Sequence, residues 1–419
     1  MIAPDLRRSP GSRSTAEALT SKMHVLFVHP AFPGQFGHIA AHLIKEQGLS
    51  CTFVSEEPAG TVDGIRKIQY HVKPDFKPSA FLSQDFEEEL AHAEAVYEAL
   101  KPLRDSIRPD LIVGHAGWGT TLFLRELYPE VPVIDYFEYF YRPHRSAIDF
   151  RPEWPASERT VLRHRVQNAM VMLHLEYCTA GYSPTHFQQS LFPQSYRPKI
   201  RVIHDGIDTS FWRREAIPGG GEGTRIVTYV SRSLESMRGF DIFMRMAKLI
   251  YEAYPDVVFL VAGWDTVEYG SDLEHIEEKS FKEHVLKEDN YDLDRIRFLG
   301  PVAPASLLQL FNLSDLHVYL TVPFVLSWSL LQAMACGCTI LGSDTAPVKE
   351  VIRDGQNGIL RDFFDVEGLA AAAVQVLTDP AGYRDLGRAA EETVRERYSL
   401  EVVMPPMLAF FEELAGGAS

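Results

Sequence analysis

Hydrophobic positions in the first half of the chain alternate between short continuous runs and helical spacing. Residues 25–28 form an apolar run, a loop rich in Gly and Pro follows, and apolar residues then recur every three or four positions over 39–44. Further apolar runs cover residues 51–54, 111–113 and 131–134. Strands that are apolar on both faces are covered by helices on both sides, so this order predicts a parallel sheet of the α/β class.

The same alternation restarts beyond residues 218–221, Pro-Gly-Gly-Gly, which form the strongest breaker cluster of the chain. A second doubly wound α/β domain is therefore expected. In open parallel sheets, ligands bind at the carboxyl ends of the strands, so a site is expected in the loops that face a cleft between the two domains. The expected elements are strands at 226–230, 257–262, 296–299, 316–320 and 339–342, a helix at 240–254, and a helix that ends at 336–337.

This pattern divides the chain into two main domains. The polar N-terminal segment is rich in Ser and Arg, and the highly charged stretch 265–294 is expected to be a surface insertion. A helix near the C-terminus is expected to break at Pro405-Pro406 before a final helix. The expected boundaries are a flexible leader at 1–22, a first domain at 23–205, a linker at 206–224, a second domain at 225–385 and C-terminal helices at 386–419 that pack back toward the first domain.

Composition narrows the class of protein. With 46% hydrophobic and 23% charged residues, the chain is typical of a globular protein. The formal charge of −16 disfavours nucleic acid as a partner, because phosphate binding needs clustered cations. Four cysteines are too few for a disulfide scaffold, and no stretch of about 18 residues is apolar enough to span a membrane. A cytoplasmic protein with reduced thiols is expected.

Candidate ligand-binding groups lie in three loops of the second half. The loop 231–239 follows an expected strand and carries Arg232 and Arg238 just before a helix. Guanidinium groups beside a helix N-terminus favour a diphosphate, although two solvated arginines are the alternative. The other loops are 298–302, after a strand, and 323–337, which leads into a helix.

These segments carry a family resemblance that covers roughly residues 23–400. The matching segments are Arg232 with Arg238-Gly239, Phe298-Leu299-Gly300-Pro301-Val302, Gln332-Ala333-Met334-Ala335-Cys336-Gly337, Gly342-Ser343-Asp344 and Asp354-Gly355-Gln356-Asn357-Gly358. In order and spacing they resemble glycosyltransferase family 4, and the run PFVLSWSLL at 323–331 is similar to a bacterial branch of it. The resemblance implies the GT-B fold: two Rossmann-like domains that face each other across a cleft, with a C-terminal helix that returns to the first domain.

The resemblance also implies a reaction. It indicates a retaining glycosyltransferase that moves a sugar from a nucleotide diphospho-sugar to an acceptor that the sequence does not identify. Arg232 and Arg238 would stabilise the charge that grows on the leaving diphosphate, so neither a metal nor another cofactor is expected. His115 and Glu138 are further catalytic candidates near the sugar. Asp135 is a third candidate nucleophile, although departure of the diphosphate from the front face needs no enzyme nucleophile.

Residue types alone leave other interpretations open for the first domain. His115 can be a structural histidine, and Glu138 can be a structural partner of Arg142. By the resemblance, donor binding is expected from Gly34, Gln35, Gly263, Val302, Phe324, Leu326, Ser327, Trp328, Ser329 and Gln332.

Two of these positions depart from the family pattern, which carries glutamates where Phe324 and Gln332 stand here. An amide at 332 can still form hydrogen bonds with ribose hydroxyls, whereas a phenylalanine at 324 cannot accept a hydrogen bond from a sugar. Two alternative functions therefore stay open: a nucleotide-sugar-binding pseudoenzyme without activity, and a sugar-nucleotide epimerase of the same fold.

Basic residues gather in one segment of the first domain, residues 142–170, against the acidic balance of the whole chain. One interpretation is a solvated helix crossed by salt bridges. The other, which the family resemblance implies, is a surface for a phosphate-bearing or lipid-linked acceptor, which would bring the protein to the inner face of the membrane as a peripheral partner. The arginines concerned are Arg142, Arg145, Arg151, Arg159, Arg163 and Arg165.

Overall fold

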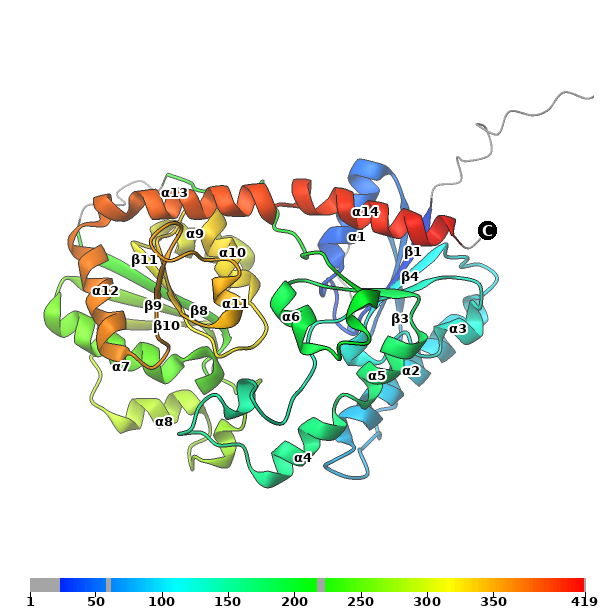
Figure 1. The fold of residues 1–419 in the computed structure, drawn as a ribbon, viewed down its shortest axis with the longest axis horizontal. Coiled ribbons are helices and arrows are strands. Elements are labelled where there is room, and N and C mark those ends of the chain that lie inside the picture. The colour runs from blue at the N-terminus through cyan, green and yellow to red at the C-terminus, as the bar shows by residue number, and fades with distance from the viewer. Residues whose placement is uncertain (1–22, 58–61, 217–222, 418–419) are drawn as a thin grey trace, which may run out of the picture.

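The computed structural model describes residues 23–57, 62–216 and 223–417. Within them the strands form two separate sheets, each with helices packed against it (Figure 1). The expected leader at 1–22 and the Pro-Gly-Gly-Gly part of the expected linker lie outside the described residues.

The first sheet alternates strands and helices along the chain. Its strands are β1 (His24–Val28), β2 (Ser50–Ser55), β3 (Ile65–Gln69), β4 (Leu111–His115), β5 (Val133–Tyr136), β6 (Ala180–Ser183) and β7 (Ile200–Val202). The α-helices of this part are α1 (Gly37–Gln47), α2 (Gln84–Leu100), α3 (Leu124–Leu127), α4 (Glu158–Val166), α5 (Ala169–Tyr177) and α6 (His186–Leu191).

The second sheet repeats this architecture. Its strands are β8 (Arg225–Ser233), β9 (Val257–Trp264), β10 (Ile296–Gly300), β11 (Leu316–Tyr319), β12 (Ile340–Ser343) and β13 (Ile359–Arg361). The α-helices are α7 (Phe240–Ala253), α8 (Phe281–Glu288), α9 (Pro304–Leu313), α10 (Trp328–Ala335), α11 (Ala346–Lys349) and α12 (Val366–Thr378), followed by α13 (Pro380–Arg397) and α14 (Leu400–Gly416).

Both sheets are parallel throughout and doubly wound. The strand order is β3-β2-β1-β4-β5-β6-β7 in the first and β10-β9-β8-β11-β12-β13 in the second. Every residue of β4 is buried, as is every residue of β11 and β12, because helices cover both faces of the sheet. The expected fold class of two Rossmann-like α/β domains is confirmed.

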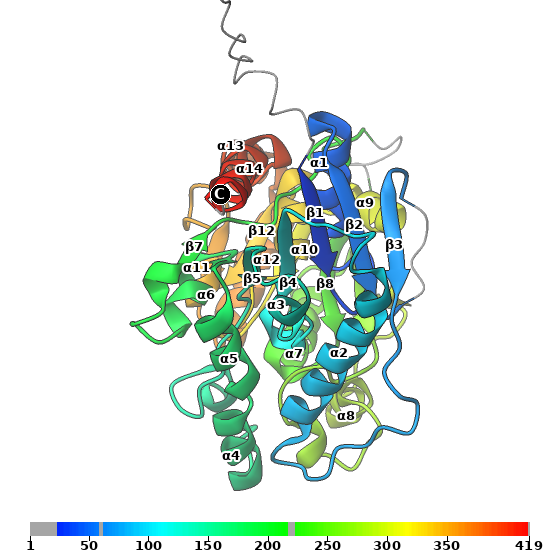
Figure 2. The same ribbon diagram turned by 90° about the vertical axis from the view of Figure 1, so that its right-hand side faces the viewer.

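The two C-terminal helices pack on different domains. Helix α13 packs on α10 and buries Ala390 and Val394 in the second domain, so the expectation that both helices pack toward the first domain is corrected for α13. Helix α14 buries Met407 and Phe410 against the core of the first domain, beside α1 and β1, as both ribbon views show (Figures 1 and 2). The expected return of a C-terminal helix to the first domain is confirmed.

The helix break expected at Pro405-Pro406 is wrong. Both prolines lie inside α14, and the helix is interrupted earlier, between α13 and α14, where Ile207 forms hydrogen bonds with Tyr398 and Leu400. Both prolines are exposed, so the carbonyls that lose their amide donors can turn toward water. The apolar face of the helix is buried, and that burial offsets the cost of the two prolines.

A second crossing between the domains is made by residues 142–157, called the arm below. In sequence the arm follows β5 of the first domain, but it packs on the second, between α7 and α8 (Figure 1). The ring of Phe150 stacks on Phe364 at 5.3 Å between centroids, and Trp154 packs edge-on to Phe281 at 5.2 Å. The arm therefore ties the two domains together on the side opposite α14.

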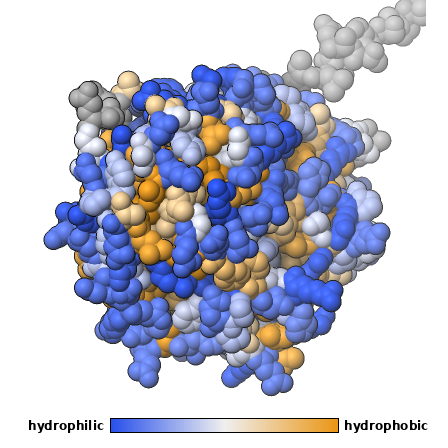
Figure 3. Space-filling view, turned by 60° about the vertical axis from the view of Figure 1, so that its left-hand side comes forward, coloured by the Kyte–Doolittle hydropathy of each residue, from blue (hydrophilic) through white to orange (hydrophobic). Residues whose placement is uncertain are grey.

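The face of the molecule on the side of the second domain is mostly hydrophilic. In Figure 3, polar residues dominate this face and apolar residues form smaller patches among them. None of the helices within the described residues combines the length and the apolar character needed to cross a membrane.

We expect Phe410→Ala to lower the free energy of unfolding by about 3–5 kcal/mol, because it removes a fully buried ring from the contact between α14 and the first domain. The matched control is Val402→Ala in the same helix, where the side chain is 41% exposed and the change should stay within about 0.5 kcal/mol. Urea unfolding measures both. Equal effects of the two substitutions would contradict this role of α14.

Candidate functional site

Three strands of the first domain bring polar side chains to one edge of its sheet. His29 follows β1, His115 ends β4 and Glu138 follows β5. Because the carboxyl ends of parallel strands meet at the same edge, the His115 Nε2 and Glu138 Oε2 atoms lie 3.5 Å apart, and the rings of His29 and His115 lie 5.7 Å apart. Glu138 therefore pairs with a histidine, whereas Arg142 donates to the backbone carbonyl of Leu191.

The glycine-rich loop after β1 is packed directly against His29. Gly34 has a φ of +49°, and a Cβ atom built there would lie 2.5 Å from His29 Nδ1, so this position requires glycine. The Gln35 side chain interacts with His29 as well. Burial and the neighbouring His115 lower the pKa of His29 to about 4, so its imidazole is neutral at pH 7.

The two arginines predicted to bind the diphosphate differ in environment. Arg238 is buried in the short turn between β8 and α7, where its Nη1 donates to Thr321 Oγ1 and to the Val325 carbonyl, both at 3.0 Å. Arg232, at the end of β8, has a side chain that is 64% exposed and lies 3.7 Å from Glu268. One guanidinium is fixed in the wall of the site, and the other is held only loosely beside it.

The loop that carries these arginines is held from behind by buried polar groups. Glu235 Oε2 accepts the backbone N–H groups of Glu268 and Tyr269 at 2.7 and 3.0 Å. Asp272 accepts the N–H of Ser236 at 2.8 Å. Burial raises the pKa of Glu235 to about 7 although these hydrogen bonds oppose the shift. The conformation of the loop is thus set by residues of the stretch 265–294, which was expected to be a surface insertion, and that expectation is corrected.

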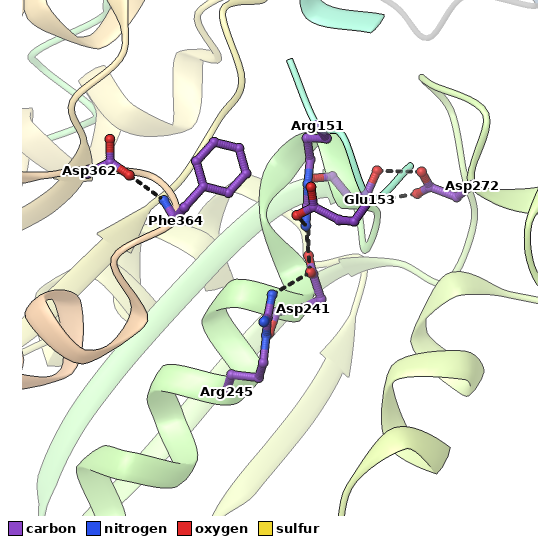
Figure 4. Close-up of polar contacts among 8 residues, drawn as sticks. Arg151, Glu153, Asp241, Arg245, Asp272, Asp362 and Phe364 are labelled. Atoms are coloured by element: carbon purple, nitrogen blue, oxygen red, sulfur yellow. Dashed lines mark hydrogen bonds and ion pairs between the residues drawn. The ribbon is translucent and has the colours of Figure 1, made fainter. Parts of the chain in front are cut away.

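The arm adds a buried ion pair to the same loop. Arg151 donates to both carboxylate oxygens of Asp241 at 2.7 Å and to the carbonyl of Ser236 at 2.8 Å. Figure 4 shows Arg151 and Arg245 converging on the Asp241 carboxylate, with Phe364 alongside. Arg151 comes from the first domain in sequence, so a residue of one domain supports the loop of the other.

Phe324 fills the position where the family resemblance implies a glutamate. Its ring lies edge-on to Tyr139 of the first domain at 4.6 Å and tilted against Tyr269 at 4.9 Å, and the Arg238 guanidinium lies 5.5 Å from its centroid. Phe324 thus contributes a cation–π contact and an apolar wall, and it supplies no acceptor for a sugar hydroxyl.

The remaining predicted donor-binding positions surround the start of α10 and the ends of β9 and β10. Ser327 caps α10 by accepting the N–H of Ser329 at 3.3 Å, and its own N–H donates to the Tyr319 hydroxyl. The side-chain amide of Gln332 is partly exposed and has no hydrogen-bond partner among the described residues. Leu326 and Val302 belong to a hydrophobic cluster, and a Cβ atom at Gly263 would lie 2.7 Å from the Ser231 carbonyl oxygen.

Trp328, at the start of α10, connects the two domains through its side chain. Its indole Nε1 donates to Asp205 Oδ2 at 2.7 Å, and the same carboxylate oxygen accepts the hydroxyl of Tyr136 at 3.2 Å. The Trp328 ring lies 5.5 Å from His38, whose Nε2 forms a hydrogen bond with the carbonyl of Asp205. Burial raises the pKa of Asp205 to about 7, although the hydrogen bonds from Trp328 and Tyr136 oppose the shift.

The polar edge of the first domain, with His115 and Glu138, faces the arginine loop of the second domain across the cleft. Burial acts to raise the pKa of Glu138, but its contact with His115 and the charge of Arg232 lower it, and the resulting pKa lies below the ordinary value. Glu138 is therefore ionised at neutral pH and is close enough to Arg232 to sense its charge. The structure thus brings Arg232, Arg238, His115 and Glu138 together at one site.

Asp135 lies outside this group. Its carboxylate accepts the Thr121 hydroxyl at 2.6 Å and is paired with His174 at 2.8 Å in the buried core. Both oxygens are engaged away from the cleft, so Asp135 is not available as the nucleophile that the sequence suggested. No cluster of three or more metal-ligating side chains occurs in the part of the chain that the structure describes.

The sequence patterns did not identify three residues of the site. His29 ends a strand in the same way as His115, so the rule that favours strand ends could have identified it. Asp205 and Tyr269 carried no local signal, because Asp205 sits at the domain boundary and Tyr269 lies within the charged stretch. Their roles arise from contacts that are distant in sequence.

The two facing parallel domains, with candidate groups at their carboxyl edges, define a protein of the GT-B fold. The structure matches sucrose-phosphate synthase of Thermosynechococcus elongatus with a TM-score of 0.71 and 17% identity, over 94% of this chain and all of the other. It matches Anabaena HepE, solved in complex with UDP-glucose, with a TM-score of 0.68 and 16% identity, over 93% of this chain and all of the other.

Family models identify the chain more closely. Residues 47–212 match the model described as glycosyl transferase family 4 group, and residues 212–393 match the model described as glycosyl transferases group 1. The chain belongs to this glycosyltransferase family, and the resemblance drawn from its motifs is confirmed.

Characterised relatives are distant and match only in part. N-acetyl-alpha-D-glucosaminyl L-malate synthase of Bacillus anthracis is 28% identical over 211 residues, which are 49% of this chain and 51% of that protein. Phosphatidyl-myo-inositol mannosyltransferase of Mycolicibacterium smegmatis is 27% identical over 223 residues, which are 51% and 52% of the two chains. The matched regions thus span about half the length of these relatives.

We expect Arg151→Met to destabilise the protein by about 3–5 kcal/mol, because it leaves a buried carboxylate at Asp241 without its main partner. The double variant Arg151→Met/Asp241→Leu should recover much of that loss, since it removes both charges together. Urea unfolding of the two variants provides the comparison. A double variant as unstable as the single one would show that the ion pair is not the source of the effect.

Asp205 predicts a pH dependence of stability. Its pKa is about 7 in the folded protein against 3.8 for the ordinary group, so between these values the folded state binds a proton that the unfolded state has lost. Its contribution to stability therefore falls as pH rises from about 4 to about 7. Asp205→Asn should remove this contribution, so the melting temperature of the variant relative to wild type should be higher at pH 8 than at pH 5.

The control for this comparison is Asp385→Asn, at a side chain that is 81% exposed and pairs with Arg388 on the surface. This variant should keep the pH profile of the wild type. A constant difference between Asp205→Asn and wild type across pH would contradict the assignment of a raised pKa to Asp205.

Proposed function

We propose that the protein is a retaining glycosyltransferase that moves a sugar from a UDP-sugar to an acceptor without a metal ion. The observation that carries this proposal is the arginine pair at the cleft. Arg238 is fixed by Thr321 and Val325, and Arg232 stands beside it with most of its side chain exposed. Two such cations match the two phosphates of a nucleotide diphosphate.

The arginines act on the leaving group. As the bond between the anomeric carbon and the phosphate oxygen breaks, negative charge grows on the diphosphate. The two arginines therefore stabilise the transition state more strongly than the ground state. Arg238 needs little reorganisation because its guanidinium is already held in place. Arg232 is free to close on the phosphates once a donor is bound.

Glu138 and His115 are proposed to act at the sugar. A carboxylate with a lowered pKa is ionised at neutral pH and stabilises the positive charge that develops at the anomeric carbon. The acceptor oxygen then approaches from the face that the diphosphate leaves, and the hydroxyl proton passes to the departing phosphate oxygen. The configuration is retained without a covalent intermediate on the enzyme.

UDP is the favoured nucleotide because HepE, whose fold is similar, was solved with UDP-glucose bound. The free amide of Gln332 is proposed to form hydrogen bonds with the ribose hydroxyls, in place of the glutamate of the family pattern. The aromatic contacts of Phe324 favour a second candidate, a UDP-sugar-binding protein without activity, because this side chain supplies no polar group for the donor sugar.

The test begins with thermal shifts in UDP, GDP and ADP, since a ligand that binds only the folded state raises the melting temperature. UDP should give the largest shift. Release of UDP from UDP-glucose and UDP-N-acetylglucosamine then measures turnover. UDP binding without turnover would favour the inactive candidate, and a sugar nucleotide of altered configuration would favour the epimerase.

We expect Arg232→Ala to lower turnover by more than about a hundredfold, the usual effect of removing one group that stabilises charge in the transition state. The matched control is Arg388→Ala on α13, whose side chain is 75% exposed and far from the cleft, and it should retain full activity. Near-normal turnover of Arg232→Ala would overturn the proposed role of the arginine pair.

A further inference from the structure

A cavity of about 180 Å³ lies between the domains, beside the candidate site. Tyr139 and Tyr141 line it from the first domain, Ala147 lines it from the arm, and Tyr269 and Phe324 line it from the second domain. An apolar cavity of roughly 150 Å³ accommodates a benzene ring, so this space suits one six-membered ring. None of the donor-binding roles described above uses the cavity beyond its Phe324 wall.

Several polar groups of the cavity lining have no partner in the protein. The hydroxyls of Tyr141 and Tyr269 form no hydrogen bond to any described residue. The Gln167 Oε1 atom is buried and also lacks a hydrogen-bond partner among the described residues. Leaving the buried Gln167 oxygen without a partner is costly, and the hydroxyls of the partly buried Tyr141 and Tyr269 have unused hydrogen-bonding capacity. These groups therefore mark positions where a ligand can supply the missing hydrogen bonds.

The basic side chains that line the cavity are already hydrogen-bonded within the protein or are neutral. Arg163 Nε donates to Asp85 Oδ2 at 2.8 Å, and its Nη2 donates to Oδ1 of the same carboxylate. The Arg142 guanidinium donates hydrogen bonds to the backbone carbonyls of Leu191 and Ser190. Burial lowers the pKa of the third basic group, His164, so this imidazole is neutral at pH 7.

The carboxylate of Glu274 also lines the cavity, where it accepts the hydroxyl of Thr160 at 2.7 Å. Glu268 adds a second carboxylate, 3.7 Å from Arg232. Arg163 is paired with Asp85, Arg142 donates to backbone carbonyls, and two carboxylates line the cavity, so it offers little to a phosphate or carboxylate ligand. Aromatic walls with unpaired hydroxyl and amide groups suit a ring that is apolar on its faces and polar at its edge.

We propose that this cavity binds the acceptor and that the acceptor residue is an uncharged sugar ring. The inference rests on the proposed transferase function and adds the substrate class. It differs from the phosphate-bearing acceptor that the basic segment suggested, because the arginines of that segment beside the cavity are engaged elsewhere. Arg163 is paired with Asp85, Arg142 donates to backbone carbonyls and Arg151 is buried against Asp241.

The position of the cavity fits the reaction. The Arg238 guanidinium lies 5.8 Å from the ring centroid of Tyr269, so the cavity wall adjoins the diphosphate site. A sugar hydroxyl in the cavity forms the new bond to the anomeric carbon as the bond from that carbon to the diphosphate oxygen breaks. The hydroxyl proton passes to the released diphosphate, so the step balances without a further reactant.

The first experiment measures UDP release from UDP-glucose with and without added sugars. Methyl α-D-glucopyranoside, methyl α-D-mannopyranoside and methyl β-D-galactopyranoside represent uncharged rings, and glucose 6-phosphate and glycerol 3-phosphate represent anionic acceptors. At least one uncharged glycoside should accelerate release, and the phosphates should not. Acceleration by a phosphate and by none of the glycosides would overturn the inference.

The second experiment uses variants that remove one polar group each. Tyr141→Phe and Tyr269→Phe should raise the KM for the glycoside roughly three- to tenfold, the effect of one lost hydrogen bond. The matched control is Tyr177→Phe, at a tyrosine that is 56% exposed and outside the cavity, and it should leave this KM unchanged. Melting temperatures and UDP-induced shifts establish that each variant is folded and binds nucleotide. An unchanged KM in both cavity variants would count against the inference.

A third measurement keeps this inference separate from the proposed function. Saturation-transfer NMR detects binding of the methyl glycosides to the UDP-bound protein without any turnover. Loss of that signal in Gln167→Leu would support the cavity as the sugar site even if no sugar nucleotide is turned over, in which case only the transferase proposal fails. Turnover of a donor combined with no glycoside binding and no glycoside acceleration would leave the transferase standing and remove the inference.

Discussion

The site depends on where the Arg238 guanidinium is held. Its hydrogen bonds to Thr321 and Val325 join the turn after β8 to the segment before α10, so one buried cation fixes two loops of the second domain relative to each other. Phe324 covers the same guanidinium at 5.5 Å and reaches Tyr139 of the first domain. A single buried charge thus links the loop 231–239, the segment before α10 and Tyr139 on the opposite wall of the cleft.

Burying such a charge is costly unless its donors are satisfied and its surroundings are rigid. Thr321 and Val325 accept hydrogen bonds from Arg238, and the carboxylates of Glu235 and Asp272 hold the loop by accepting backbone N–H groups. The same network leaves Arg232 outside, with 64% of its side chain exposed. In the proposed transferase the two arginines have different roles: the buried Arg238 defines the place of the phosphates, and the exposed Arg232 adjusts to the bound donor.

Local patterns were sufficient to predict β1, β2, β4, β5 and β8 to β12, both domains and the arginine loop, because each depends on apolar runs and spacing within a few residues. They did not predict β3, β7 or β13, because β3 lacks a continuous apolar run and β7 and β13 have only three residues each. They also favoured strand ends, which correctly brought His115 and Glu138 to one edge. The pattern could not place Asp205 or Tyr269, because their partners are distant in sequence. Asp205 is bound by Trp328, 123 positions away, and Tyr269 packs on Phe324, about 55 positions away. The helix break predicted at Pro405-Pro406 was wrong for a related reason. The cost of the prolines is outweighed by packing of α14 against the first domain, and this packing cannot be recognised from the local sequence.

The crossing of the arm has a consequence for the evolution and engineering of this molecule. Residues 142–157 are encoded with the first domain but are seated on the second, through Phe150, Arg151 and Trp154. A chimera that exchanges the second domain at the linker would keep its own arm but would pack it against the surface of another protein. Recombination between relatives would therefore have to exchange the arm together with the surface of α7 and its neighbours that the arm contacts. The first domain and the second domain would then be inherited together.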